Sequence, residues 1–355
     1  MIKAREDVTS LTIYTGSNGQ KGCTCRCIGC SQEKYGLAHP FYQGTIEQIY
    51  EVLDIFPNLK RTIILGNPDP TVDTNFCNRV AKILIEKNIR VRFSTSGFRA
   101  SQLIPVLCDR LDPEMVDYVS FSIDSIDEIE LEKMKGRKIC FKELEKAIQW
   151  CIKHNYRLKV QPTFWTTNID EYKMIVDFFH IMGINWFSFH AGSCEAFVSD
   201  EVVRKHVDPW EWRKLVKSLG EYCSQKGISL HLPYLFVNEE EYKKFIKKKG
   251  EKCNINELKN TQVWLENNYI RTTHCPLLNE VMPFHYNLME NEKISFEIKH
   301  NRPGYCPITK ECLGTNLAKE SVDGYGFEFI KDGKEKLFSI CRFYNFEVNY
   351  PDIIR

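Results

Sequence analysis

Two hydrophobic patterns alternate along the first two-thirds of the chain. Short runs rich in β-branched and aromatic residues, such as LTIYT at 11–15, precede longer stretches with apolar residues at helical spacing, such as TIEQIYEVLDIF at 45–56. Thr45 is a suitable N-cap for that first helix. Further strands are predicted at 61–65, 89–95, 116–124, 157–164, 184–190 and 228–236, and further helices at 71–87, 101–111, 141–154, 170–183 and 209–227.

Six strand–helix units in succession predict an α/β fold around a parallel sheet. The predicted strands are nearly all apolar, so we expect helices to cover a sheet that is apolar on both faces. An open doubly wound sheet and a partial or full βα barrel both satisfy this pattern. In either fold the chemistry lies in the loops that follow the C-terminal ends of the strands.

The pattern changes after about residue 237. Regular alternation stops, and short β-like runs appear at 294–300, 326–333 and 336–344. We therefore predict two domains, a barrel at 1–236 and a smaller cysteine-containing α+β domain at 237–355.

Composition and charge narrow the class of protein. The 355 residues are 43% hydrophobic and 27% charged, with a formal net charge of +1, so no overall field favours nucleic acid or an anionic membrane. The charged run at 239–252 is expected to form a solvated helix face. No stretch approaches the roughly 20 apolar residues of a membrane span, and the N-terminus lacks the apolar core of a signal peptide. We expect a cytoplasmic protein.

Fifteen cysteines change this ordinary picture. Clustered thiols in a reducing compartment are typical ligands of metals or iron–sulfur clusters. Four of them fall within CTCRCIGC at 23–30, directly after the first predicted strand. Scattered ones lie in apolar helical patterns and are expected to be small core residues, namely Cys77, Cys108, Cys140, Cys151 and Cys223.

Cys23, Cys27 and Cys30 form the pattern CxxxCxxC. A [4Fe–4S] cluster normally takes four thiolates, so three would leave one iron open. In this pattern the chain resembles the radical S-adenosylmethionine (radical SAM) superfamily. The resemblance implies a (β/α)6 partial TIM barrel, a catalytic [4Fe–4S] cluster on these three cysteines, and S-adenosylmethionine on the open iron. In that family the reduced cluster cleaves S-adenosylmethionine to a 5′-deoxyadenosyl radical, which takes a hydrogen atom from the substrate.

The resemblance also implies residues near the cofactor. LGNPDP at 65–70 stands where the family has a glycine-rich turn that holds the methionine amino group, with Asp69 displaced from the expected acidic position. VSFSIDS at 119–125 resembles the serine-bearing strand near the ribose, and Arg137 could approach the methionine carboxylate. Strand-end hydroxyls at 94–96 suit a sugar or carboxylate, or simply form a strand-to-helix turn. The cofactor-binding candidates are Gly66, Asn67, Ser94, Ser96, Ser122, Asp124, Arg137 and Gln161.

Cys25 leaves alternatives open. As a fourth ligand it would close the cluster and make the loop an electron-transfer site. We expect it instead to point away from the cluster, because closely alternating residues of an extended chain crowd one face. Four cysteines can also bind zinc tetrahedrally, although zinc sites usually draw CxxC pairs from two separated loops. The sequence also departs from many family members at Gly29, where they carry an aromatic residue near the adenine.

Two further features are candidates for chemistry. His190, at the end of the sixth predicted strand, is a candidate catalytic residue, with structural hydrogen bonding as the alternative. In the C-terminal region the resemblance implies an auxiliary [4Fe–4S] cluster of the twitch or SPASM type, with Cys253 as an alternate ligand. Its predicted ligands are Cys275, Cys306, Cys312 and Cys341.

The resemblance favours a radical SAM enzyme that modifies a peptide or natural-product precursor and receives electrons from a flavodoxin or ferredoxin. A nucleoside or other small metabolite is the alternative substrate class. A non-catalytic iron–sulfur electron carrier and a zinc-stabilised binding protein are alternatives of other kinds. The first strand begins near residue 11, and we expect neither a peptide-recognition nor a cobalamin-binding domain before it.

Overall fold

The structure is a computed structural model of the whole chain. It describes residues 9–16, 23, 25–28, 44–66, 69–191, 207, 209–232, 235–241, 243, 260–266, 269–273, 284–287, 318–320, 326–331 and 335–340. Among these residues, no helix is long and apolar enough to cross a membrane.

Seven strands that alternate with helices form the central sheet, in the order β1-β2-β3-β4-β5-β7-β9, and every pair is parallel. Within the described residues β9 pairs only with β7, so the sheet does not close. This confirms the partial TIM barrel that the family resemblance implies, whereas the strand–helix units alone also allowed an open doubly wound sheet. The strands are β1 (Ser10–Tyr14), β2 (Arg61–Ile64), β3 (Arg90–Thr95), β4 (Val116–Phe121), β5 (Leu158–Val160), β7 (Trp186–Ser188) and β9 (Ser229–His231).

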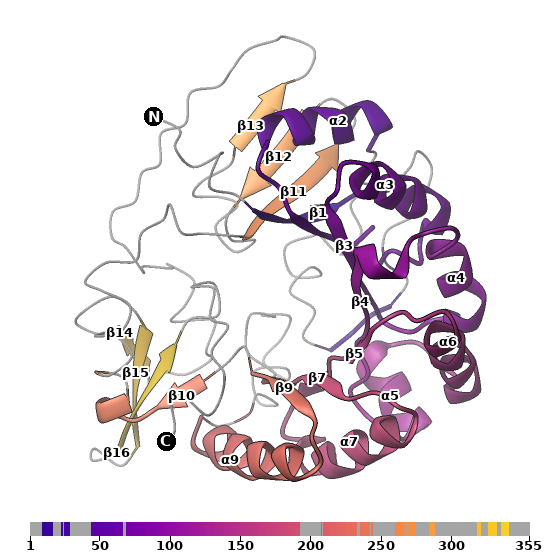
Figure 1. Cartoon of the computed structure of the whole chain (residues 1–355). Coiled ribbons are helices and arrows are strands. Elements are labelled where there is room, and N and C mark those ends of the chain that lie inside the picture. Colours follow the sequence, from indigo (N-terminus) through magenta and orange to yellow (C-terminus); the bar gives the residue numbers. More distant parts are fainter. Residues whose placement is uncertain are drawn as a thin grey trace.

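The helices lie along the outer side of the curved sheet (Figure 1). Leu, Ile, Val and Phe side chains from the helices and the strands form one continuous core between the two layers. The helices are α2 (Ile46–Ile55), α3 (Thr74–Glu86), α4 (Ala100–Leu107), α5 (Glu128–Lys135), α6 (Phe141–Lys153), α7 (Tyr172–Ile181) and α9 (Pro209–Gln225).

The two faces of the sheet differ in chemistry, and here the expectation of two apolar faces is wrong. Along β3, buried Val91 and Phe93 join the helix-facing core, whereas Arg92 and Ser94 alternate with them and are only partly buried. The register pairs Arg92 with Tyr118 and Ser94 with Ser120, so these side chains share the opposite face. The inner face of the barrel is therefore polar, because strand residues alternate between faces.

Local signals set the boundaries of several elements. Thr45 caps α2 in a reciprocal capping box with Gln48, as its position predicts. The predicted strand at 157–164 is interrupted at 161–162, leaving β5 and the short β6 (Thr163–Phe164). Pro162 accounts for this break, because it has no backbone N–H to donate to a ladder. The predicted strand at 184–190 divides in the same way into β7 and β8 (His190–Ala191), and β8 pairs with β6.

The C-terminal part of the chain adds strands in two places. β11 (Asn260–Glu266) pairs in parallel with β1, and β12 (Tyr269–Thr273) and β13 (Phe284–Asn287) follow it, so the described residues give the barrel sheet ten strands. A separate four-stranded sheet has the order β10-β16-β15-β14. Two of its strands match predicted runs, and the run at 294–300 lies outside the described residues. The domain boundary near 236 stays a prediction. The second sheet comprises β10 (Leu235–Val237), β14 (Ala318–Glu320), β15 (Gly326–Lys331) and β16 (Glu335–Ile340).

Four of the five scattered cysteines lie in the core as expected. Cys77, Cys108, Cys151 and Cys223 are each at most 1% exposed. Burial raises the pKa of the Cys151 and Cys223 thiols to about 12, so both are neutral packing groups. Cys140 differs, because it is partly exposed at the N-cap of α6.

Candidate active site at the strand ends

The cysteine segment is attached to the barrel through α5. The Arg26 backbone N–H donates to the Lys135 carbonyl at 2.7 Å, and the Ile28 N–H donates to the Met134 carbonyl at 2.8 Å. Ile28 also packs against Met134 and Trp165 in a small apolar cluster. These contacts hold residues 25–28 at the C-terminal end of α5, which follows β4.

Gly136 permits this contact. It ends α5 with φ of 61° in the left-handed region, where glycine avoids the steric cost of a side chain. A Cβ added there would lie 2.5 Å from the Cβ of Arg26 and 2.6 Å from its carbonyl oxygen. Both the turn and the docked cysteine segment therefore require a glycine.

Three thiols converge in the segment. The Cys25 side chain hydrogen-bonds with the Cys23 and Cys27 thiols and with Ser96 at the end of β3. The hydrogen bond with Cys23 is the largest of the effects that lower the pKa of Cys25, and the same bond, together with burial, raises the pKa of Cys23. Cys25 is 6% exposed and lies between the other two thiols, and its orientation away from a bound cluster stays a prediction. Cys30 lies outside the described residues.

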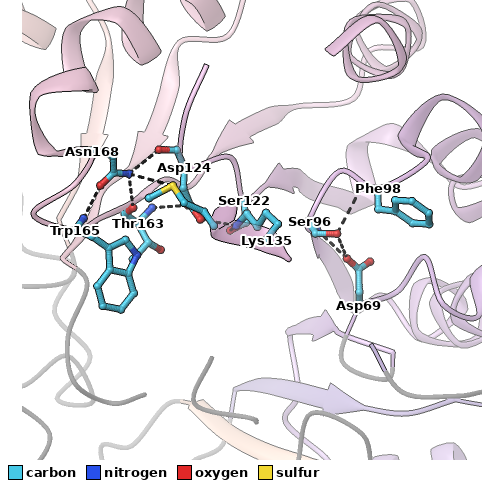
Figure 2. Close-up of polar contacts among 10 residues, drawn as sticks. Asp69, Ser96, Phe98, Ser122, Asp124, Lys135, Thr163, Trp165 and Asn168 are labelled. Carbon is cyan, nitrogen blue, oxygen red and sulfur yellow. Dashed lines mark hydrogen bonds and ion pairs between the residues drawn. The ribbon is translucent and has the colours of Figure 1, made fainter. Parts of the chain in front are cut away.

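Asp69 ties the ends of two strands together. Its carboxylate accepts hydrogen bonds from the Thr71 N–H and the Thr95 hydroxyl, each at 2.9 Å. It also accepts from both the N–H and the hydroxyl of Ser96 at 2.8 Å (Figure 2). Asp69 is 6% exposed, so this displaced acidic residue holds the turn after β2 against the end of β3. Ser96, a predicted cofactor ligand, is already engaged with Asp69 and Cys25.

Gly66 forms the turn after β2. Its φ is 50°, and a Cβ would lie 2.7 Å from the Asp69 carbonyl oxygen, so the turn closes tightly on itself. The Gly66 carbonyl accepts a hydrogen bond from the Thr15 N–H at 2.9 Å, which joins the ends of β1 and β2. The predicted turn is present at Gly66, and Asn67 lies outside the described residues.

A buried ion pair stands at the end of β4. Lys135 Nζ lies 2.7 Å from the Asp124 carboxylate and donates to Ser122 Oγ at 3.0 Å (Figure 2). The two charged side chains are 4% and 7% exposed. Burial by itself lowers the pKa of Lys135, but Asp124 and then Cys27 outweigh it, so the net pKa is raised. Lys135 is therefore a cation beside the thiols, and it is a site residue that the sequence did not single out.

The same ion pair fixes the next strand. The Thr163 N–H donates to the other oxygen of Asp124 at 2.7 Å, and the Asn168 amide donates to the Asp124 carbonyl at 2.6 Å (Figure 2). Asn168 in turn accepts from the Trp165 N–H at 2.6 Å. Both carboxylate oxygens of Asp124 thus have protein partners, so this predicted cofactor ligand positions the strand ends in the structure.

Arg137 and Ser94 are two predicted cofactor ligands whose polar atoms could still bind a ligand. The Arg137 guanidinium lies over the Phe98 ring, with its central carbon 3.5 Å from the ring centroid. Ser94 lies on the inner face beside Ser120.

Gln161 and His190 belong to a row of polar groups on the inner face. Ser120 donates to the Gln161 carbonyl oxygen, and Gln161 Nε2 lies 3.3 Å from His190 Nε2. Ser188 Oγ lies 3.2 Å from that same nitrogen and 2.8 Å from His231 Nδ1. Because an amide nitrogen only donates, His190 Nε2 is the acceptor in this arrangement. His231 on β9 is thus hydrogen-bonded within this row.

The predicted auxiliary ligands Cys275, Cys306, Cys312 and Cys341, and the alternate Cys253, lie outside the described residues. The auxiliary cluster stays a prediction.

Comparisons with known proteins agree with this geometry. Residues 17–179 match the model of the Radical SAM superfamily. Streptococcus suis SuiB bound to precursor peptide SuiA superimposes with a TM-score of 0.57 at 14% identity, covering 80% of this chain and 63% of SuiB. SuiB bound to S-adenosylmethionine gives a TM-score of 0.51 at 14% identity, covering 80% of this chain and 62% of that one.

A third solved structure, anSMEcpe with bound AdoMet and Kp18Cys peptide, gives a TM-score of 0.50 at 13% identity, covering 79% of this chain and 78% of that one. No curated protein matches the sequence. This chain spans less than two thirds of the length of SuiB. At these identities the solved structures establish the fold, and the family model places the cysteine segment and the first strand ends within its domain. Residues 17–179, just under half of the chain, thus resemble a radical SAM superfamily domain.

Proposed function

We propose that the protein is a radical SAM enzyme that modifies a peptide or a peptide-derived natural product. The observation that carries this proposal is the docking of the cysteine segment on α5, which places Cys23, Cys25 and Cys27 beside the polar ends of β3 and β4. Several soft thiolate donors at one place suit iron–sulfur chemistry.

Cys23, Cys27 and Cys30 would hold the [4Fe–4S] cluster. When bound and reduced, the cluster supplies the electron that cleaves S-adenosylmethionine to a 5′-deoxyadenosyl radical. Lys135 places a positive charge beside Cys25 and Cys27, which favours the ionised form of these two thiols. Asp69, Gly66 and Gly136 keep the surrounding turns in place.

The groups with unused polar capacity are the candidates for direct contact with S-adenosylmethionine. Arg137 offers guanidinium donors for a carboxylate, and its stacking on Phe98 limits its freedom. Ser122 can still donate its hydroxyl proton, because in its contact with Lys135 it is the acceptor. Ser94 and Gln161 stay candidates for the same role, whereas Asp124 and Ser96 would position their neighbours.

His190 is the candidate for proton handling. Its Nε2 accepts hydrogen bonds from Gln161 and Ser188, so this nitrogen carries no proton in this arrangement and its lone pair is engaged by these two donors. Ser188 lies between His190 and His231, so a proton could move from His231 through Ser188 toward that nitrogen. This role requires that the substrate reach the inner face near the end of β7.

The peptide substrate class is proposed from the neighbours, since SuiB was solved with a precursor peptide and anSMEcpe with a Kp18Cys peptide. A small metabolite such as a nucleoside stays the alternative. Electron delivery by a flavodoxin or ferredoxin, and action in the cytoplasm, are part of the same proposal.

The test is an anaerobic reconstitution of the full chain. Iron and sulfide are counted per chain, and 5′-deoxyadenosine is measured after addition of dithionite and S-adenosylmethionine. We expect about four irons for one cluster and about eight for two. The combined replacement of Cys23, Cys27 and Cys30 by alanine should abolish 5′-deoxyadenosine formation. Cys223→Ala, which removes a core thiol remote from the segment, is the matched control and should retain it.

Cys25→Ala separates the alternatives. Retained cleavage supports three ligands and an open iron. Iron without cleavage in any variant would favour the electron carrier, and zinc in place of iron would favour the binding protein. Either of these two results would overturn the proposed function.

A further inference from the structure

A second polar cluster lies on the inner face of the barrel, below the strand ends. It consists of four side chains from neighbouring strands: Arg92 on β3, Tyr118 on β4, Lys159 on β5 and Trp186 on β7. Both cations lie over the Tyr118 ring, and Lys159 also lies over the Trp186 ring. The register pairs Lys159 with Ser120. Lys159 and Gln161 are two residues apart on one face, which corresponds to about 6.6 Å along the strand. The cluster therefore lies one pleat below the row that contains His190.

Lys159 is the centre of this cluster. It is 6% exposed, and its Nζ lies 4.7 Å from the ring centroid of Tyr118 and 5.3 Å from that of Trp186. The two rings meet edge to face with centroids 5.0 Å apart. Aromatic faces partly stabilise an ammonium group, but they do not neutralise its charge.

Arg92 brings a second cation to the same place. Its Nη2 donates to Ser10 Oγ at 2.6 Å, and its central carbon lies 5.9 Å from the Tyr118 centroid. Its Nε is buried, and no group in the described part of the chain accepts a hydrogen bond from it. A buried donor without an acceptor costs about 1–3 kcal/mol, so a site that keeps one is ready for an incoming acceptor.

No carboxylate among the described residues forms an ion pair with Lys159 or Arg92. Asp117, the acidic residue next to Tyr118, is engaged with Arg90 and lies 3.4 Å from Arg61 Nε. Burial, and then the nearby charge of Arg92, lower the pKa of Lys159 to about 7. Two cations without a counter-ion repel each other, and each buried charge is costly on its own. An anion between them would reduce both the repulsion and the cost of burying unpaired charge.

We propose that Arg92 and Lys159 form a binding site for a carboxylate of the substrate, with Tyr118 and Trp186 as its walls. This inference rests on the proposed function, because it assigns an acidic group to the peptide that the enzyme would modify. The backbone amides here are paired in parallel ladders, so Lys159 Nζ and Arg92 Nε are the donors that would bind the carboxylate, while Arg92 Nη2 is held by Ser10. One guanidinium and one amine match the charge and the two oxygens of a carboxylate. Anchored one pleat below His190, the substrate would extend toward the strand ends.

The test is calorimetric titration of the reconstituted full chain, without reductant, at pH 7. The probes are glutamate capped at both backbone ends, the equally capped glutamine, N-acetylglycine and inorganic phosphate. We expect capped glutamate to bind if the site takes a side-chain carboxylate, and N-acetylglycine to bind if it takes the carboxylate of a chain end. Capped glutamine, which has no carboxylate, should not bind. Proton uptake is measured by repeating the titration in buffers of different ionisation enthalpy. Because Lys159 must be charged to bind the anion, binding should take up about half a proton per site at pH 7 and almost none at pH 5.5.

Variants locate the site. Lys159→Met and Arg92→Met should each weaken the carboxylate at least tenfold, on the order expected for one charge-assisted hydrogen bond. Lys146→Met, on the exposed side of α6, is the matched control and should bind like the wild type. Equal binding of glutamate and glutamine, unchanged affinity in Lys159→Met, or binding of phosphate alone would overturn the proposal.

The titration is independent of radical chemistry. If carboxylate binds but no 5′-deoxyadenosine forms, the binding site stands and the proposed function fails. If cleavage occurs but no carboxylate binds, the reverse holds. The comparison of capped glutamate with capped glutamine uses only the wild-type chain, so it decides the question even if a variant fails to fold.

Discussion

Replacing Lys159 with methionine is expected to stabilise the folded protein at neutral pH. In the absence of a bound anion, the ammonium is buried against two rings and close to Arg92, and this environment disfavours its charge. Methionine keeps the unbranched apolar stem and removes the charge, so the packing between Tyr118 and Trp186 is retained.

The magnitude follows from proton linkage. An unfolded chain holds a lysine pKa near ~10.4, whereas the fold lowers the pKa of Lys159 to about 7. The folded state thus binds fewer protons than the unfolded state between these two values, and stability rises with pH across that window. At about 1.4 kcal/mol per pKa unit, the cost is about 4–5 kcal/mol below pH 7 and vanishes near pH 10.4.

The assay is urea unfolding of wild type and Lys159→Met at pH 7, 8.5 and 10, followed by circular dichroism. The variant should be more stable by several kcal/mol at pH 7, and the difference should shrink steadily toward pH 10. Lys146→Met, where the lysine is exposed, should show no such trend. A difference that is absent, or that stays constant with pH, would refute the assignment of a buried, charge-disfavouring site to Lys159.

Three other substitutions test the frame around the strand ends. Gly136→Ala should lower iron incorporation and destabilise the fold more than the control Gly227→Ala. Both positions carry the same left-handed strain of about 1–2 kcal/mol, but a Cβ at Gly227 would meet open space. Equal losses of stability in urea, with unchanged iron content, would contradict the predicted clash at Gly136. Thr45→Ala should cost about 1 kcal/mol in thermal unfolding by removing the cap of α2, and Thr45→Ser should recover most of it, so equal losses would count against the cap. Asp124→Asn should cost about 3–5 kcal/mol because it leaves Lys135 buried without its counter-charge, and adding Lys135→Met should recover much of this. A double variant as unstable as the single one would show that the ion pair is not the cause.

The sequence alone determined the order of elements and the place of the cysteines. Helical spacing of apolar residues is a local property, so the six strand–helix units and the cap at Thr45 followed from it. The rule that loops after parallel strands gather at one rim then placed the cysteine segment and Gly66 near the ends of the first strands. Tight backbone approaches at Gly66 and Gly136 are consistent with glycine at both positions.

Only the tertiary structure decided which polar groups meet. Lys135 and Asp124 are brought together by the turn into α5, and Asp69 reaches Ser96 across two strands. β11 joins β1 although about 250 residues separate them in the chain, and pairing over such distances leaves no local signal.

The inner face of the barrel shows the same limit most clearly. Strands dominated by apolar residues suggested two apolar faces, because composition does not state how a strand is turned. Once the register is set, Arg92, Lys159 and His190, which come from three different strands, share one face, while the apolar residues between them pack under the helices. A shift of one residue would exchange the two faces. The polar interior is therefore a property of how the strands pair, which no single strand encodes.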